Sequence, residues 1–177
     1  EAQAEAIAAR LAAERFDRLV SSDLGRALAT ARAIAARTGH EIVADARLRE
    51  RNYGVAEGLT YGEIGVHYPE VFSRVRDTDP DYVVPGGESR RQLFERVRRA
   101  FEALARENAG RRLAVVCHGG VLAALYRHIR GIPVGASQAI PIPNASYNAL
   151  VFDERGWTVE AWADTAHLAA AEPFVEP

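Results

Sequence analysis

The order of apolar and polar positions along the chain predicts helices that alternate with short strands. Residues 1–14 are rich in alanine with larger apolar residues four apart, which is typical of an amphipathic helix. Residues 16–20 form a short apolar strand that meets a serine-rich turn of the kind that favours helix N-caps, and a second alanine-rich helix extends to Arg37. Another short strand is predicted at 41–44.

The pattern resumes after an interval with little periodicity. Between residues 47 and 88, glycines and prolines interrupt the sequence every few positions, which predicts loops and short helices. Residues 88–108 regain helical periodicity, 112–117 form a β-branched run, and a further apolar helix extends to residue 129. The α/β alternation therefore continues through the second half of the chain.

These elements favour one α/β domain, a three-layer α/β/α sandwich around a mostly parallel sheet. The last two strands, 147–152 and 157–162, flank turn residues at 153–156 and predict a hairpin. The chain has 177 residues and contains no linker, internal repeat or low-complexity tract. We therefore assign residues 1–177 to a single domain.

Composition and charge exclude several other classes of protein. The chain is 48% apolar and 26% charged, as expected of a folded globular protein, and no apolar run approaches the ~20 residues of a membrane helix. A formal charge of −2 gives no general attraction for nucleic acid or an anionic membrane, so any anion binding must be local. The single cysteine, Cys117, and the absence of a secretory signal pattern favour a cytoplasmic location.

Familiar catalytic signatures are missing from the sequence. There is no Walker loop, G-x-G-x-x-G, C-x-x-C, H-E-x-x-H or G-x-S-x-G, which removes support for NTP hydrolysis, dinucleotide redox, zinc hydrolysis and serine hydrolysis. No set of His, Asp and Glu residues has metal-ligand spacing, so neither a metal nor another cofactor is expected.

The most informative local motif is C-H-G-G, in which His118 follows the strand at 112–117 and precedes two glycines. Ligands of open α/β sheets bind at the carboxyl ends of the strands, and the amides of a following helix favour an anion there. Gly119 and Gly120 would let such a ligand approach the backbone. A histidine that merely caps the helix is the alternative interpretation.

Two further turns carry the residue types that phosphoryl transfer needs. The run S-S-D-L-G-R-A at 21–27 places Arg26 where it can hold two phosphate oxygens, and L-R-E-R-N-Y-G at 48–54 places Glu50 between two arginines. Each turn alone is also typical of a solvated surface. Together with His118 they supply an anion clamp, a charged donor and a proton source.

The order and spacing of these motifs resemble the histidine phosphatase superfamily, the phosphoglycerate mutase-like proteins, over nearly the whole chain. The matching pieces are the opening helix with Gln3-Ala4, S-S-D-L-x-R-A-x-x-T-A at 21–31, L-x-E-R-x-Y-G-x-x-E-G at 48–58, P-G-G-E-S at 85–89, C-H-G-G at 117–120 and P-N-A-S at 143–146. The resemblance implies that Arg26 binds phosphate, that His118 is the second active-site histidine and that Glu50 protonates the leaving group.

The resemblance also implies contacts with the rest of the substrate. Arg51 resembles a residue that can touch a distal anion, and Gly119 lies beside the phosphate site. Asn144, with Ser146, either lines the rim of the pocket or forms a plain turn. A homodimer is left open.

One part of the family pattern is absent. The family's nucleophile is a histidine in an R-H-G motif that becomes a phosphohistidine, which water then hydrolyses. None of the five histidines here lies between Arg and Gly, and the chain contains no methionine. We therefore expect the first strand, the nucleophile and one phosphate-binding arginine to lie in a segment outside these residues, or to be absent from the protein.

The proposed roles place different demands on the three residues. Arg26 and a protonated His118 should hold the transition state more tightly than the substrate, because negative charge builds on the phosphoryl oxygens. Glu50 must carry a proton near neutral pH, which burial or an anionic substrate would favour and the neighbouring arginines oppose.

Several functions remain to be separated. The interval from Glu50 to His118 is shorter than in the mutases, so we favour a phosphomonoesterase acting on small phosphorylated metabolites over a cofactor-dependent phosphoglycerate mutase. A non-catalytic phosphate-binding module would retain Arg26 and His118 without turnover. A Cys117 nucleophile is disfavoured, since neighbours in a strand point to opposite faces and Cys117 would not meet His118.

Residues 60–87 are expected to form a lid that selects the substrate. This segment mixes aromatic and basic groups, which suits a phosphorylated small molecule. Alternatively, the aromatic residues only pack the loop onto the domain. The residues concerned are Tyr61, His67, Tyr68, Phe72, Arg74 and Tyr82.

Overall fold

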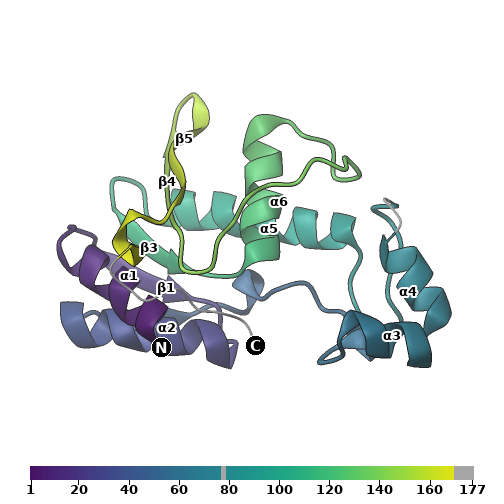
Figure 1. Ribbon diagram of the computed structural model, residues 1–177. Helices are drawn as coiled ribbons and strands as arrows, with labels where there is room; N and C mark the ends of the chain where they lie inside the picture. Colours follow the sequence, from purple (N-terminus) through teal and green to yellow (C-terminus); the bar gives the residue numbers. More distant parts are fainter. Residues whose placement is uncertain (77–78, 170–177) are drawn as a thin grey trace.

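The computed structural model describes residues 1–76 and 79–169, and its helices and strands alternate as the sequence predicts (Figure 1). The helices are α1 Ala2–Ala12, α2 Gly25–Thr38, α3 Tyr61–His67, α4 Pro69–Arg76, α5 Arg90–Glu107 and α6 Gly119–Arg130. The strands are β1 Arg18–Ser21, β2 Ile42–Ala44, β3 Leu113–Val116, β4 Tyr147–Asp153 and β5 Gly156–Asp164. Short 3-10 turns occur at Ala46–Leu48, Gly54–Ala56 and Ala166–Leu168.

The central sheet is parallel, with strand order β2-β1-β3. Val20 in β1 lies opposite Val43 on one side and Val115 on the other. The two C-terminal strands form a separate antiparallel hairpin in which Asp153 lies opposite Gly156. The predicted α/β class, the parallel sheet and the hairpin are all confirmed.

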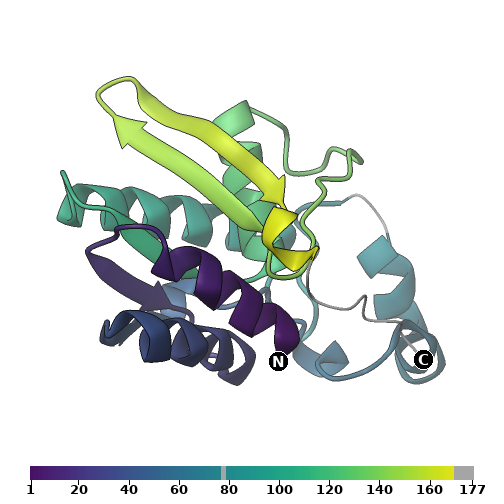
Figure 2. The same cartoon turned by 60° about the vertical axis from the view of Figure 1, so that its left-hand side comes forward.

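Alternating side chains of the sheet build the two outer layers. Leu19 and Ala114 pack against α1 and α2, whereas Val20 belongs to the larger core formed with α5 and α6. Because successive residues of a strand point to opposite faces, one apolar run can supply both cores. Figure 2 shows α1 and α2 on one side of the sheet and α5 and α6 on the other.

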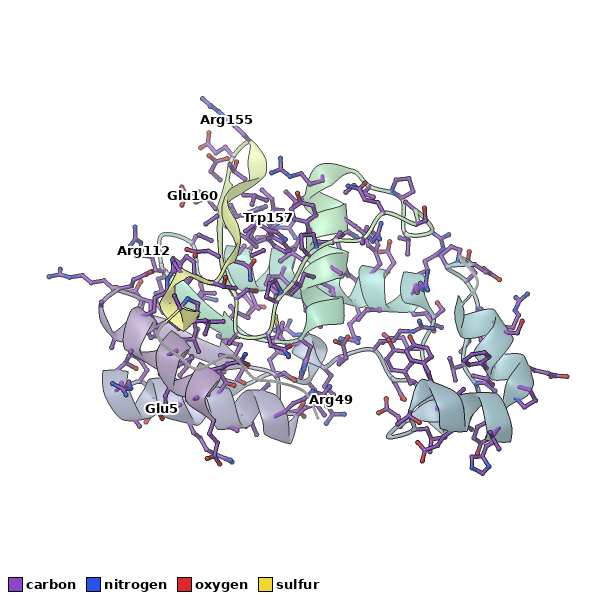
Figure 3. The ribbon with its side chains drawn as sticks, in the orientation of Figure 1. Glu5, Arg49, Arg112, Arg155, Trp157 and Glu160 are labelled. Atoms are coloured by element: carbon purple, nitrogen blue, oxygen red, sulfur yellow. The ribbon has the colours of Figure 1, made fainter. Side chains whose placement is uncertain are left out.

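The β4–β5 hairpin is anchored to this body by aromatic packing. The ring of Trp157 lies edge-on to Phe101 of α5, with centroids 6.4 Å apart, and Leu150 packs against the same core. Figure 3 shows Trp157 on the side of the hairpin that faces the helices.

A separate small cluster holds the region around α3 and α4, which we call the α3–α4 lobe (residues 55–76 and 79–84). Its buried residues are Ala56, Ile64, Val71 and Val84. Figure 1 shows this lobe beside the main body, at the opposite end from α1 and α2. The loops and short helices that the sequence predicts between 47 and 88 are thus confirmed for the residues that the structure describes.

Across residues 1–76 and 79–169, no helix is both long enough and apolar enough to cross a membrane.

Candidate active site

The three predicted site residues converge where β1 and β3 end. Arg26 lies in the first turn of α2, directly beyond β1, and His118 lies between β3 and α6. The Arg26 Nε–H donates to His118 Nδ1 over 3.2 Å. The Glu50 carboxylate accepts the Gly120 N–H at 2.8 Å, two residues beyond His118. Three turns that are far apart in the sequence therefore form one site.

His118 does not act as a helix cap. It occupies the N-cap position of α6 with extended backbone, but its side chain makes no capping hydrogen bond. Its Nε2 lies 2.8 Å from Ser22 Oγ, and its side chain is buried. The capping interpretation is wrong, and both ring nitrogens are engaged by groups of the site.

Ser22 is a site residue that the sequence analysis missed. Its type and place suggested a helix N-cap, but Leu24 occupies that position without a side-chain cap. Ser22 is fully buried, and its Oγ accepts the Leu24 N–H. Since His118 Nδ1 accepts from Arg26, the neutral ring must carry its proton on Nε2 and donate it to Ser22. The sequence signal that could have identified Ser22 is the pair Ser21-Ser22, which directly follows an apolar strand at the edge of the sheet where ligands bind.

The electrostatic surroundings favour a neutral His118 in this ligand-free site. Burial lowers the pKa of its imidazole, and the charge of Arg26 lowers it further. Both effects oppose the imidazolium form because it would carry charge into a poorly solvated site beside another cation. An anion bound beside His118 would shift this balance back toward the imidazolium form.

Glu50 is held through both of its oxygens. Its Oε1 accepts the N–H of Arg51 at 2.7 Å, and its Oε2 accepts the N–H of Gly120. A Cβ added at Gly120 would overlap the Glu50 carboxylate, whereas one added at Gly119 would meet open space. Gly120 thus provides room for Glu50, a role different from the ligand approach that the sequence suggested.

Arg51 lies beside Glu50 and is buried. Its Nε–H donates to the Glu88 carbonyl at 2.8 Å, and its guanidinium carbon lies 5.1 Å from the centroid of the Tyr53 ring. Burial lowers the pKa of this guanidinium. The remaining N–H groups of Arg51 are thus carried on a side chain of fixed position next to the proposed proton donor.

An ion pair lies at the edge of the site. Arg49, labelled in Figure 3, donates to both oxygens of Asp23 at 2.7 and 2.6 Å. This contact lowers the pKa of the Asp23 carboxyl. Arg49 therefore offsets an acidic charge that would otherwise stand one residue from Ser22.

The structure does not bring every predicted residue to this site. The side chain of Asn144 is exposed, and none of the hydrogen bonds of Asn144 or Ser146 involves Arg26, Glu50 or His118. Ser146 instead closes a local turn with Pro143 and Asn148. Their roles in substrate binding stay predictions.

The predicted lid residues divide into two groups. Phe72 and Tyr82 pack against the apolar cluster of the α3–α4 lobe, as the packing interpretation expects. Tyr61 and Tyr68 are 67% and 38% exposed, and His67 is exposed as well. Arg74 bonds Asp79 and lies over the Tyr82 ring.

Two alternative chemistries gain no support. Burial raises the pKa of the Cys117 thiol to about 12, so the thiol is protonated at neutral pH and is a poor nucleophile. Within the described part of the chain, no three His, Cys, Asp or Glu side chains are grouped closely enough to hold a metal ion.

The chain is thus an α/β protein in which Arg26, Glu50 and His118 are grouped at the carboxyl ends of β1 and β3. Comparison with known families makes this specific: a model of the histidine phosphatase superfamily (branch 1) matches residues 1–165, and the chain belongs to that superfamily.

Named relatives agree with this assignment. The chain is 38% identical over 170 residues to phosphoglycerate mutase-like protein 4 of Arabidopsis thaliana, which covers 94% of this chain and 73% of the relative. It is 39% identical over 171 residues to a metal-independent phosphoserine phosphatase of the same plant, covering 95% and 70%. A mycobacterial glucosyl-3-phosphoglycerate phosphatase superposes with a TM-score of 0.77 at 32% identity, covering 93% and 85%. Family membership and these relatives support a phosphatase activity in general.

Proposed function

We propose that the protein hydrolyses small phosphorylated metabolites through a phosphohistidine intermediate, with Glu50 as the general acid. The observation that carries this proposal is the convergence of Arg26, His118 and Glu50 at one sheet edge. The three groups supply the cationic contacts and the proton donor that phosphoryl transfer requires.

Arg26 and His118 bind the phosphoryl group in this scheme. A phosphate dianion placed against Arg26 and His118 Nδ1 reverses the balance that keeps the imidazole neutral, because an adjacent negative charge favours imidazolium. His118 then donates from Nδ1 to a phosphoryl oxygen while Ser22 continues to accept from Nε2. Both contacts strengthen as charge builds on the oxygens in the transition state.

Glu50 transfers a proton to the departing oxygen of the ester. Each of its carboxylate oxygens accepts one backbone N–H and keeps a lone pair free to hold a proton. The Gly120 contact fixes the carboxyl two residues from His118, so its proton is delivered beside the phosphorus. In the second step the carboxylate accepts a proton from the attacking water.

In this scheme the nucleophile is a histidine outside these 177 residues, since none of their five histidines lies in an R-H-G motif. Within the described residues, β3 pairs only with β1, and β4 pairs only with β5. An unpaired strand edge presents free N–H and C=O groups that another strand can bond. We place the missing first strand of the domain against the open edge of β3, where its carboxyl end would meet His118.

A mass measurement and a phosphorylation assay test this scheme. The intact mass of the purified natural protein should exceed that of the 177 residues by the missing segment. Incubation with p-nitrophenyl phosphate and an alkaline quench should trap one acid-labile phosphohistidine in that segment. Phosphate binding without any phosphoprotein or turnover would instead indicate the non-catalytic module.

The role of Glu50 predicts a dependence on the leaving group. Glu50→Gln should slow hydrolysis of a phosphorylated alcohol by roughly 10²-fold or more, because its poor leaving group needs a proton. Hydrolysis of p-nitrophenyl phosphate should fall far less, since nitrophenolate leaves unprotonated. The matched control is Glu154→Gln, in the exposed turn between β4 and β5. Equal losses on both substrates would refute the proton-donor role.

A phosphoglycerate mutase is the second candidate, because the names of several relatives refer to that activity. The two are distinguished by the acceptor of the phosphoryl group: water in a phosphatase, a second phosphoglycerate hydroxyl in a mutase. Release of inorganic phosphate from phosphoserine and 3-phosphoglycerate, unaffected by EDTA, is the expected result. Isomerisation without phosphate release would favour the mutase.

A further inference from the structure

We propose that Arg96 of α5 is a positioning residue that, together with Glu88, fixes the Glu50 loop so that the Glu50 carboxyl stays on Gly120. This inference rests on the proposed role of Glu50 and adds to it two residues that lie outside the site itself. The side chain of Arg96 donates to three backbone carbonyls of the Glu50 loop, those of Arg47, Arg49 and Glu50.

All five N–H donors of Arg96 are used. Nη1 donates to the carbonyls of Arg47 and Arg49 at 2.8 and 2.9 Å, and Nη2 reaches the Glu50 carbonyl at 3.4 Å. Nε and Nη2 also donate to the two oxygens of Glu88 at 3.0 and 2.8 Å. The planar fork of a guanidinium can make these bonds at once, whereas a lysine has only three donors on one nitrogen.

The main chain of Glu88 also forms hydrogen bonds with this loop. Its N–H donates to the Asn52 carbonyl at 2.8 Å, and its own carbonyl accepts from Arg51 Nε. The backbones also touch nearby, since a Cβ at Gly87 would lie 2.6 Å from the Asn52 oxygen. Arg96 and Glu88 thus hold residues 47–52 along most of their length.

This arrangement holds Glu50 from two sides. Its carbonyl is held toward α5 by Arg96, while its carboxylate is held toward α6 by Gly120. If Arg96 is lost, three carbonyls lose their donors and only the Gly120 and Arg51 amides hold the carboxylate in place. A displacement of about 1 Å is enough to impair a proton donor greatly.

The test compares Arg96→Lys with Arg98→Lys. Both substitutions keep a positive charge on α5. Among the described residues, Arg98 pairs with Glu95 and Glu102 of its own helix and forms no hydrogen bond with residues 47–52. The readout is the pH dependence of the NMR resonances of the Arg51 and Gly120 amides. Both amides donate to the Glu50 carboxylate, so their chemical shifts change when it ionises. Glu50→Gln should abolish this change and thereby identifies it. We expect Arg96→Lys to lose most of the Gly120 response and Arg98→Lys to retain it. An unchanged Gly120 response in Arg96→Lys overturns the proposal.

A second variant, Glu88→Gln, keeps the proposal testable if Arg96→Lys does not fold. Glu88→Gln keeps the side-chain shape and both backbone contacts but removes the bidentate ion pair, and it should weaken the Gly120 response in the same direction. Circular dichroism establishes that each variant is folded; if Arg96→Lys is not, an unaltered response in Glu88→Gln overturns the proposal by itself.

Kinetics separate this proposal from that of the function. In the active protein, Arg96→Lys should lower kcat for a poor leaving group about tenfold more than for p-nitrophenyl phosphate, with KM little changed. If Glu50→Gln shows no leaving-group dependence, the general-acid proposal fails, while the amide measurement still decides whether Arg96 positions Glu50. If Glu50→Gln shows the dependence and Arg96→Lys does not, the positioning role fails alone.

Discussion

The candidate active site and the α3–α4 lobe are held together by different kinds of contact. At the site, Ser22 and His118 are buried and bonded to each other, and Glu50 is fixed by backbone amides. In the lobe a four-residue apolar cluster supplies the packing, and charged side chains pair at the surface, as Arg74 does with Asp79. The site depends on direction and distance, and the lobe depends mainly on burial of apolar area.

This difference suggests that the site and the α3–α4 lobe have different roles. Buried hydrogen bonds tolerate little change, because an unpaired polar group loses the compensation for its desolvation. Exposed aromatic residues such as Tyr61 can be replaced at small cost in stability. Under the proposed function, the sheet edge would therefore set the chemistry and the lobe would set the choice of substrate.

The largest expected effect tests this division directly. Arg26→Lys keeps the charge but loses the guanidinium fork, and it should lower kcat by roughly 10²- to 10³-fold. Arg74→Lys in the lobe should change kcat by less than about threefold and act mainly on KM. Arg32→Lys, on the exposed face of α2, is the control for the helix. Comparable losses of kcat from Arg26→Lys and Arg74→Lys, measured by steady-state assays, would remove the distinction between the regions.

A pair of glycines tests how the loop of the site meets the lobe. Gly54 and Gly58 both have positive φ, 52° and 75°. A Cβ added at Gly54 would collide with the Pro85–Gly87 backbone, whereas a Cβ added at Gly58 would have no atom within 4 Å. Gly58→Ala should cost about 1 to 2 kcal/mol from the left-handed backbone alone. Gly54→Ala should cost about 2 to 5 kcal/mol, because overpacking is added to that strain. Urea unfolding measures both, and equal costs would show that the two backbones separate easily.

Ser22 and Ser21 form a matched pair within the site. Both are fully buried, but Ser22 bonds the His118 ring, whereas the Ser21 hydroxyl donates to the Ser22 carbonyl. Ser22→Ala leaves the Nε2–H without a partner and should lower kcat about tenfold and stability by about 1 to 3 kcal/mol. Ser21→Ala should leave the imidazole resonances of His118 in place. Identical His118 spectra in both variants would argue against a special role for Ser22.

The smallest expected effect is the pH dependence of stability that His118 contributes. Because the pKa of His118 in the folded protein lies below its ordinary value of 6.5, the unfolded chain binds the proton first as pH falls. This contribution to stability is present above pH 6.5 and is lost as pH falls through the folded pKa. Arg26→Ala should raise the pKa of His118, and inorganic phosphate should raise it as well. An imidazole titration followed by NMR would contradict this account if either change lowered it.

Periodicity in the sequence was sufficient for the secondary structure. The β-branched run before His118 and the alanine-rich helices pack in the layers expected of them, because burial of one face requires that spacing wherever the element lies. The motifs around Arg26, Glu50 and His118 likewise lie at strand ends and adjoining loops, so the places of these three residues in the fold were predictable. Asn144 was chosen from a motif alone, and in the described structure its exposed side chain forms no hydrogen bond with Arg26, Glu50 or His118.

The sequence by itself determined which elements form and which turns carry polar side chains, since both depend on residues within a few positions of one another. Only the tertiary structure decided that Ser22 binds His118, that Gly120 makes room for Glu50 and that Arg96 serves three carbonyls almost fifty residues earlier in the chain. These partners are 96, 70 and 49 residues apart for the respective pairs. Their meeting follows from how the sheet and helices pack, and local propensity contains no information about it.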